Sequence, residues 1–64
     1  MNRNELIVTI CREAGDVGTD DEIVEGYSHN YNDGYLQDVV DPAAAGDVAA
    51  LVRMRSDAGL PIFS

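Results

Sequence analysis

Residues 19–40, TDDEIVEGYSHNYNDGYLQDVV, decide the fold class, because this stretch fits either helices or a β-hairpin. It opens with Thr19 followed three residues later by Glu22, which is a capping box, and the two aspartates between them suit the positive end of a helix dipole. Apolar side chains then recur on one helical face, at Ile23, Val24, Tyr27 and Tyr31. We therefore predict a helix over about residues 20–30.

The second half of this stretch leaves two alternatives open. Asn32-Asp33-Gly34 is typical of a turn, and a two-residue loop at Asp33-Gly34 would pair Tyr27, His29 and Tyr31 with Val40, Asp38 and Leu36. In the helical interpretation, a short helix near residues 35–40 carries Tyr35, Leu36, Val39 and Val40. We favour helices because the Thr19 cap leads directly into them, and we retain an α+β fold with a hairpin over residues 27–40 as the alternative.

A helix is also predicted upstream, over about residues 3–14. Its apolar face is formed by Leu6, Ile7, Ile10 and Ala14. Asn2 followed by Glu5 resembles a capping box, and Gly15 occupies the position of a left-handed C-terminal cap. The β-branched run Ile7–Ile10 is the main argument for a strand here.

The last predicted helix begins at Asp41 as its N-terminal cap, with Pro42 in the first helical position, and it ends at Gly59. Val48, Leu51, Val52 and Arg55 form a stripe at helical spacing along it. Gly46 is a weak point, since a glycine within a helix costs about 1 kcal/mol relative to alanine. The alternative is a helix that restarts at Asp47.

These elements predict an all-α fold: a small domain of three helices with a short fourth helical segment. We expect residues 1–64 to form this one domain. A domain of this size buries only about 60% of the surface of its unfolded chain, so its stability is marginal. It also leaves little room for a cleft of roughly 300 Å³ or more. We therefore expect a homo-oligomer, or a monomer that meets a partner through its surface.

The sequence carries no pattern of a signal peptide, and no stretch approaches the ~20 apolar residues of a membrane span. We expect a cytoplasmic protein without membrane contact, in which the single cysteine, Cys11, stays reduced.

Charge is the strongest functional signal. The chain has 12 acidic residues and four arginines, so its formal charge is 4 − 12 = −8, and no base lies between Arg12 and Arg53. Such a chain is a poor candidate for direct nucleic-acid binding, but it attracts basic protein surfaces. We predict a non-enzymatic interaction module with a partner-binding site at Asp20, Asp21, Glu22, Glu25, Tyr27 and Tyr31.

A more specific version of this hypothesis is an inhibitor encoded by a phage or mobile element, of the anti-CRISPR or anti-restriction type. Such an inhibitor would cover the nucleic-acid-binding surface of its target. One alternative is a small self-assembling structural protein, built on the Ala-rich helix and the tail Leu60–Phe63. Its acids would serve solubility or adaptation to salt.

Catalytic and metal sites are weakly indicated. Cys11 and His29 are the only conventional nucleophile and base, with Asp38 as a candidate third group to orient them. Cys11 is more simply explained as a small core residue, and His29 as an exposed residue. A calcium loop aligned on Gly34 fails at its ligand positions. We therefore expect no catalytic residue, no metal and no cofactor.

Overall fold

The first two helices begin where their capping boxes predict. In the structure, a computed structural model that describes residues 1–62, α1 spans Arg3–Glu13 and α2 spans Asp20–Asn30. At the start of α1, the Asn2 side chain accepts a hydrogen bond from the Glu5 amide at 2.8 Å, and the Glu5 carboxylate accepts one from the Asn2 amide at 3.2 Å. These reciprocal bonds satisfy amides that a helix leaves without a partner.

The ambiguous middle of the chain is helical. Three segments adjoin without a break over residues 33–44: α3 at Asp33–Tyr35, a π-helical turn η1 at Leu36–Val40, and α4 at Asp41–Ala44. Asn32 has extended backbone angles and caps this run, since its side chain accepts a hydrogen bond from the Tyr35 amide at 2.8 Å. The turn-like residues therefore start a helix, and residues 1–62 contain no strand.

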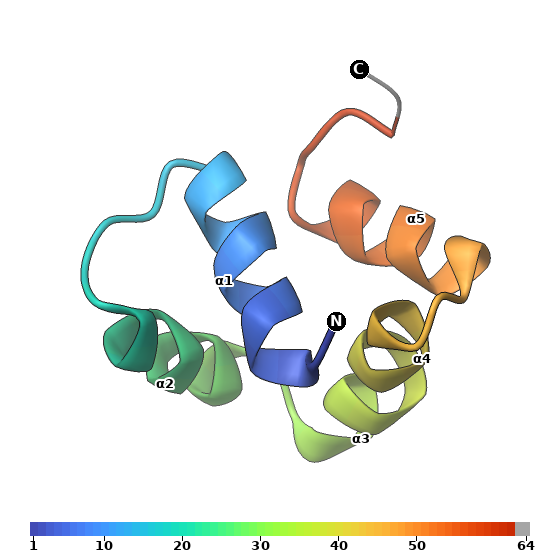
Figure 1. Cartoon of the computed structure of the whole chain (residues 1–64), viewed down its shortest axis with the longest axis horizontal. Coiled ribbons are helices and arrows are strands. Elements are labelled where there is room, and N and C mark those ends of the chain that lie inside the picture. Colours follow the sequence, from blue (N-terminus) through green and yellow to red (C-terminus); the bar gives the residue numbers. More distant parts are fainter. Residues whose placement is uncertain (63–64) are drawn as a thin grey trace.

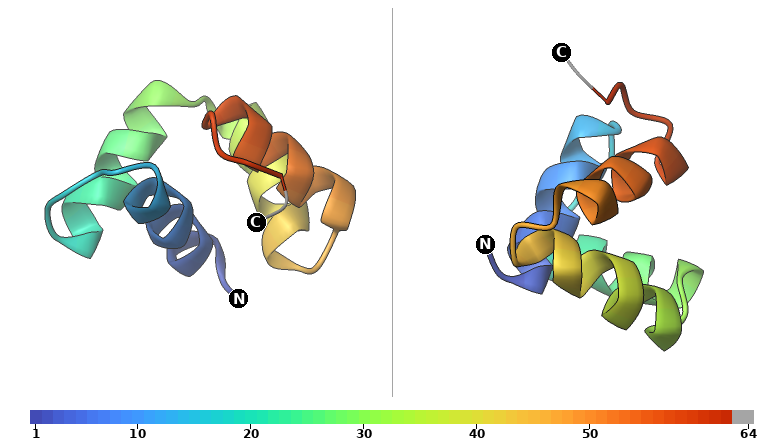
Figure 2. Two further views of the ribbon diagram at one scale, coloured as in Figure 1. Left: turned by 90° about the horizontal axis from the view of Figure 1, so that it is seen from above. Right: turned by 90° about the vertical axis from the view of Figure 1, so that its right-hand side faces the viewer.

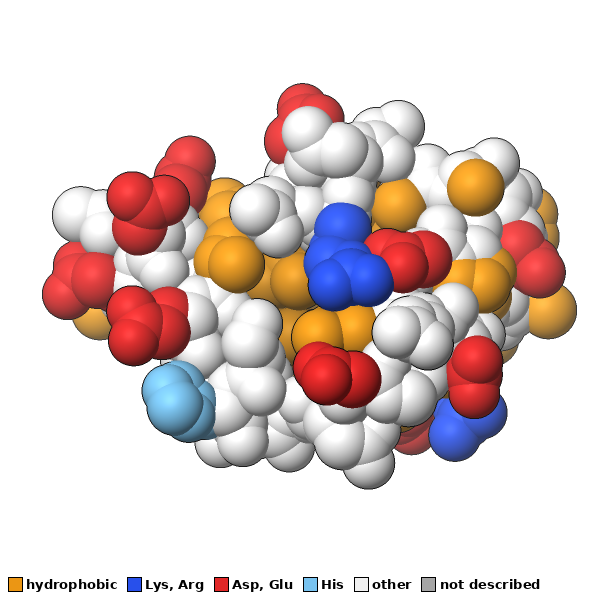
Figure 3. Space-filling view, turned by 90° about the horizontal axis from the view of Figure 1, so that it is seen from below, with side chains coloured by type: hydrophobic (Ala, Val, Ile, Leu, Met, Phe, Trp, Pro, Cys, Tyr) orange, Lys and Arg blue, Asp and Glu red, His pale blue; other side chains and the backbone are white. Residues whose placement is uncertain are grey.

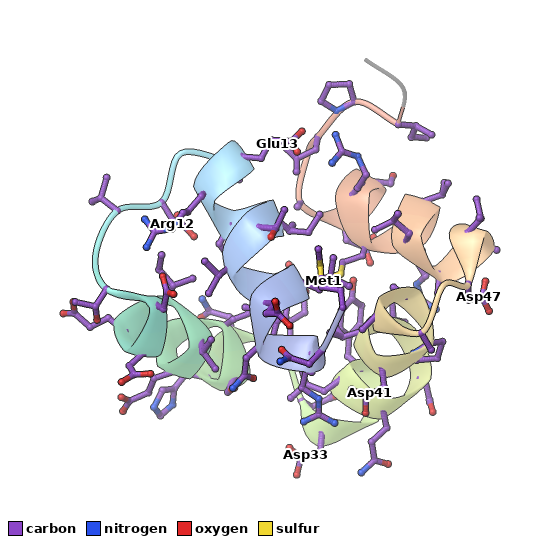
Figure 4. The ribbon with its side chains drawn as sticks, viewed as in Figure 1. Met1, Arg12, Glu13, Asp33, Asp41 and Asp47 are labelled. Atoms are coloured by element: carbon purple, nitrogen blue, oxygen red, sulfur yellow. The ribbon has the colours of Figure 1, made fainter. Side chains whose placement is uncertain are left out.

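The predicted start of the last helix at Asp41 is wrong. Asp41 has helical angles, φ −63° and ψ −46°, and its amide donates to the Leu36 carbonyl within the π-helical turn. Pro42 has no amide hydrogen and its ring crowds the carbonyl four residues before it, which accounts for the widened turn just ahead of it. The Asp41 carboxylate instead binds Arg3, whose Nε lies 2.6 Å from Oδ1. Figure 4 shows Asp41 within the helical run.

The alternative restart at Asp47 is confirmed. Gly46 interrupts the helix with a φ of +106°, and α5 spans Val48–Asp57 behind Asp47, whose side chain accepts a hydrogen bond from the Ala50 amide at 3.2 Å. The C-terminal glycine caps predicted after the first and last helices are also present, because Gly15 and Gly59 have φ values of +99° and +74°.

The predicted stripe of α5 coincides only in part with the face that the fold buries. Val48 is 70% exposed, whereas Met54 is 1% exposed and is among the largest fully buried side chains. Leu51, Val52 and Arg55 are half-buried. The buried face of α5 is therefore centred on Met54, since the contacts with the 33–44 run, and not the spacing of its valines, determine which side turns inward.

α1 lies in the middle of the fold, with α2 on one side and the 33–44 run and α5 on the other (Figures 1 and 2). The core consists of Leu6, Ile7, Ile10, Cys11, Ile23, Tyr27, Leu36, Val39, Val40, Ala43 and Met54. The radius of gyration of the molecule is 10.7 Å, which equals the value of about 10.7 Å expected for 64 folded residues. None of the helices in residues 1–62 combines the length and the apolarity needed to cross a bilayer.

The C-terminal tail is divided between core and solvent. Leu60 packs against the core, and the Pro61 carbonyl accepts a hydrogen bond from Arg55 Nε at 2.8 Å. Ile62 is 43% exposed. Phe63, the last apolar residue of the predicted tail, lies outside the described residues.

Candidate functional site

The predicted acidic residues lie on α2, and they differ in how freely they can meet a partner. Asp20 is 2.7 Å from Arg12, and Glu22 Oε1 accepts a hydrogen bond from the Thr19 amide at 2.9 Å. This hydrogen bond lowers the pKa of Glu22. Asp21 and Glu25 are exposed, and their side chains form no hydrogen bond or ion pair within residues 1–62. Because they are four residues apart on a helix, they share one face.

The arginines leave most of the acidic charge without a partner. Each of the four arginines forms an ion pair with its own acid, so 12 − 4 = 8 acids form no ion pair with an arginine. These eight are Glu5, Asp16, Asp21, Glu22, Glu25, Asp33, Asp38 and Asp47. Figure 3 shows acidic side chains gathered over the α2 end of the molecule, on the face seen from below. Three of the four acids predicted as the site belong to this uncompensated set.

The three tyrosines form a stack that crosses from α2 to α3. The rings of Tyr27 and Tyr31 lie 4.3 Å apart at 23°, and those of Tyr31 and Tyr35 lie 4.7 Å apart at 33°. Tyr27 is a core residue, 8% exposed, while Tyr31 is half-buried at the C-terminal cap of α2. The Tyr35 hydroxyl donates a hydrogen bond to the Asp57 carboxylate at 2.8 Å. Burial, and to a smaller extent this hydrogen bond, raises the pKa of Tyr35 to about 12. The role of Tyr27 and Tyr31 as partner anchors stays a prediction.

An open groove of about 390 Å³ lies along α1 and α2, larger than the small size of the chain led us to expect. Its buried walls come from Ile10, Cys11, Ile23 and Tyr27, with Tyr31 also lining it. The exposed residues at its edge include Asp16, Val17 and Glu22. Glu22, Tyr27 and Tyr31 are thus brought to one groove. Asp20 and Asp21 instead line a second groove of about 350 Å³ beside Val8 and Val24.

Gly26 also lines the larger groove, and the sequence analysis did not single it out. It lies within α2, has no positive φ, and a Cβ added to it would meet no neighbouring heavy atom within 4 Å. Neither backbone conformation nor packing therefore requires a glycine here. The detectable signal in the sequence was a glycine inside a stretch that is otherwise predicted to be helical.

Cys11 and His29 lie in different surroundings, since the first is buried and the second is exposed. Cys11 is buried, and burial together with the neighbouring Asp16 carboxylate raises the pKa of its thiol to about 11. A catalytic cysteine needs the opposite shift, because the thiolate is the nucleophile. His29 is exposed near the end of α2, and it is not among the residues that line the groove.

The described part of the chain brings together no group of three or more His, Cys, Asp or Glu side chains able to hold a metal ion. Comparison of the chain with known protein families, with curated proteins and with solved structures gives no match. The function is therefore inferred from the charges, the groove and the fold alone.

Proposed function

We propose that this protein is a non-enzymatic interaction module whose acidic α2 surface binds a basic protein surface. The observation that carries the proposal is the pair Asp21 and Glu25, which share an exposed helix face and have no ion pair within residues 1–62. Charges that are not neutralised internally remain free to attract a partner of opposite sign and to accelerate encounter with it.

The arginine pairing supports the same proposal. All four arginines are held by acids of the same chain, and the only acid of α2 that pairs with one of them is Asp20, so Asp21 and Glu25 keep their charge. A surface of one sign repels nucleic acid and favours proteins rich in lysine and arginine. The narrower version of the proposal is an inhibitor of the anti-CRISPR or anti-restriction type that covers a nucleic-acid-binding surface, and it rests on size and charge.

The experiment is a pull-down from lysate of the native host, with washes at rising salt, followed by affinity measurement with the captured protein. We expect the double variant Asp21→Arg/Glu25→Arg to bind about tenfold more weakly or worse, because like charges facing each other across an interface are strongly unfavourable. The wild-type complex should also weaken as salt rises, since exposed charges are screened over about 8 Å at physiological ionic strength.

The matched control is Asp33→Arg/Asp38→Arg on the 33–44 run, which changes the net charge by the same amount, from −8 to −4. It should bind nearly as well as the wild type. Circular dichroism must show that both variants are helical, and Asp21→Asn/Glu25→Gln replaces the first variant if it unfolds. Equal loss in the two double variants would reduce the effect to net charge, and unchanged binding in both would refute the proposal.

The self-assembling structural protein remains the competing proposal. Its Ala-rich element is partly used within the fold, since Ala43 is buried and Ala44 and Ala50 pack against the core. Light scattering separates the two proposals, because self-assembly requires a mass well above 6.9 kDa.

A further inference from the structure

The groove between α1 and α2 has apolar walls and an acidic edge. Ile10 and Ile23 are 2% and 6% exposed, so they form a wall that is already fixed in the core. Asp16 and Glu22 lie at the exposed edge, and no arginine lines the groove. This arrangement is complementary to a ligand that is both apolar and cationic.

Glu22 is positioned to meet such a cation. The Thr19 amide holds Oε1 at 2.9 Å and thereby fixes the side chain, whereas Oε2 forms no hydrogen bond within the described part of the chain. The hydrogen bonds from Thr19 lower the pKa of Glu22, so this carboxylate stays charged at neutral pH.

Gly26 keeps the groove open. A glycine within a helix costs about 1 kcal/mol relative to alanine, and here neither a positive φ nor a close neighbour requires it. Glycine is the residue that lets a backbone approach a bound ligand closely. Any larger side chain at this position would occupy the space between α1 and α2 that a ligand needs.

We propose that this groove receives an apolar side chain of the basic partner, while a lysine or arginine adjacent to it in the partner sequence reaches Asp16 and Glu22. This inference rests on the proposed function and specifies the partner segment. An open groove suits a segment of polypeptide, whereas small-molecule sites enclose most of their ligand. The groove adjoins the exposed face of α2 that carries Asp21 and Glu25, since Glu22 lines the groove and Glu25 lies about one helical turn further along the helix.

The test uses two blocked pentapeptides, Gly-Arg-Leu-Arg-Gly and Gly-Arg-Gly-Arg-Gly, titrated into the isotope-labelled protein and followed by NMR. We expect the leucine peptide to bind at least about tenfold more tightly, because burial of one leucine side chain is worth a factor of this order. Its binding should shift the amide signals of Ala14 and Gly26, which line the groove.

Gly26→Leu fills the groove, and it should remove the advantage of the leucine peptide. Ser28→Leu is the matched control, because it adds the same side chain to α2 at an exposed position that does not line the groove. It should keep the advantage. Thermal melts check that both variants fold. If Gly26→Leu does not fold, Gly26→Met is used in its place.

Three results would overturn the inference. In the first, both peptides bind the wild type equally and bind the Asp21→Arg/Glu25→Arg variant more weakly. That result would mean that the exposed face with Asp21 and Glu25 binds a basic partner without the groove. In the second, Gly26→Leu retains the advantage of the leucine peptide, which places the apolar contact elsewhere. In the third, neither peptide binds at low salt, so the inference fails while the pull-down alone decides the proposed function.

Discussion

Arg55 of α5 forms a two-point ion pair with Glu13 of α1, although 42 residues separate them in the chain. Nη1 donates to Oε1 at 2.9 Å, Nη2 donates to Oε2, and Nε donates to the Pro61 carbonyl at 2.8 Å. One side chain thus joins the C-terminal ends of two helices to the segment that follows α5. Planar, two-point pairing of this kind is specific to arginine.

Arg55→Ala should lower the melting temperature more than Arg12→Ala does. The Arg55 side chain is 17% exposed and contacts both Glu13 and the tail, whereas Arg12 is 46% exposed and pairs with Asp20, which is 71% exposed. Exposed ion pairs contribute little because water screens them. Thermal circular dichroism measures both variants, and equal melting temperatures would contradict the structural role of Arg55.

Stability should fall as the pH drops below about 4, the usual range of a carboxyl group. The hydrogen bond from Arg55 lowers the pKa of Glu13, and that from Arg3 lowers the pKa of Asp41. Because the pKa of each carboxyl is lower in the folded state, the unfolded state binds protons first as the pH falls. The stabilisation by these ion pairs is therefore complete above the pKa of the unfolded state, and it is lost as the pH falls through the pKa of the folded state. Urea denaturation at several pH values measures the slope. Arg55→Ala should show a shallower slope, and an unchanged slope would exclude the Glu13 contribution.

Met54→Ala should destabilise the fold by about 2–5 kcal/mol, the usual range for truncating a fully buried methionine. That loss is comparable with the total stability of a small domain, so we expect the variant to be largely unfolded. Val48→Ala, in the same helix, should change the stability by less than about 0.5 kcal/mol because Val48 is 70% exposed. Urea denaturation compares the two, and a reversed order would mean that α5 buries the stripe predicted from the sequence.

Asp47→Ala should destabilise the protein by about 1 kcal/mol, because it removes the N-terminal cap of α5. Asp47→Asn retains a capping oxygen and should restore most of the stability. Urea denaturation of the three proteins tests this assignment. Equal loss in the alanine and asparagine variants would show that the charge, and not the cap, is responsible.

Added salt should raise the melting temperature at neutral pH. The molecule measures 28 × 26 × 19 Å, so at 0.01 M salt, where screening extends over about 30 Å, all eight uncompensated acids repel one another. Asp21→Asn/Glu25→Gln should raise the melting temperature at low salt and lose this advantage at high salt. A melting temperature that falls with salt throughout would show that the ion pairs dominate over the repulsion.

Local signals predicted the helix starts and stops well. Thr19 and Asn2 cap helices in this chain as their side chains predict, because a cap depends on contacts within one turn. The same reasoning failed at Asp41, where Asp-Pro resembles a helix start but lies inside a helical run. The sequence placed Leu36, Val39 and Val40 on one short helix, but it did not show that the helix would continue through the proline and bury Ala43 as well.

The candidate site was predicted in part. The sequence identified the acidic residues of α2, but it could not show that Asp20 is paired with Arg12 while Asp21 and Glu25 are not. Gly26 was missed because its significance depends on the space opposite it, which belongs to α1.

The charge of −8 follows from the amino-acid sequence alone, and most helix boundaries follow from capping, which acts over a few neighbouring residues. For residues 27–40 the sequence favoured helices over a hairpin, and the packing of the helices settled the choice. The tertiary structure alone decided which acids are neutralised, which face of α5 is buried and where a groove stays open. Those properties depend on helices that lie far apart in the chain and pack together, as Arg55 and Glu13 do. No local pattern records which residues such packing brings into contact.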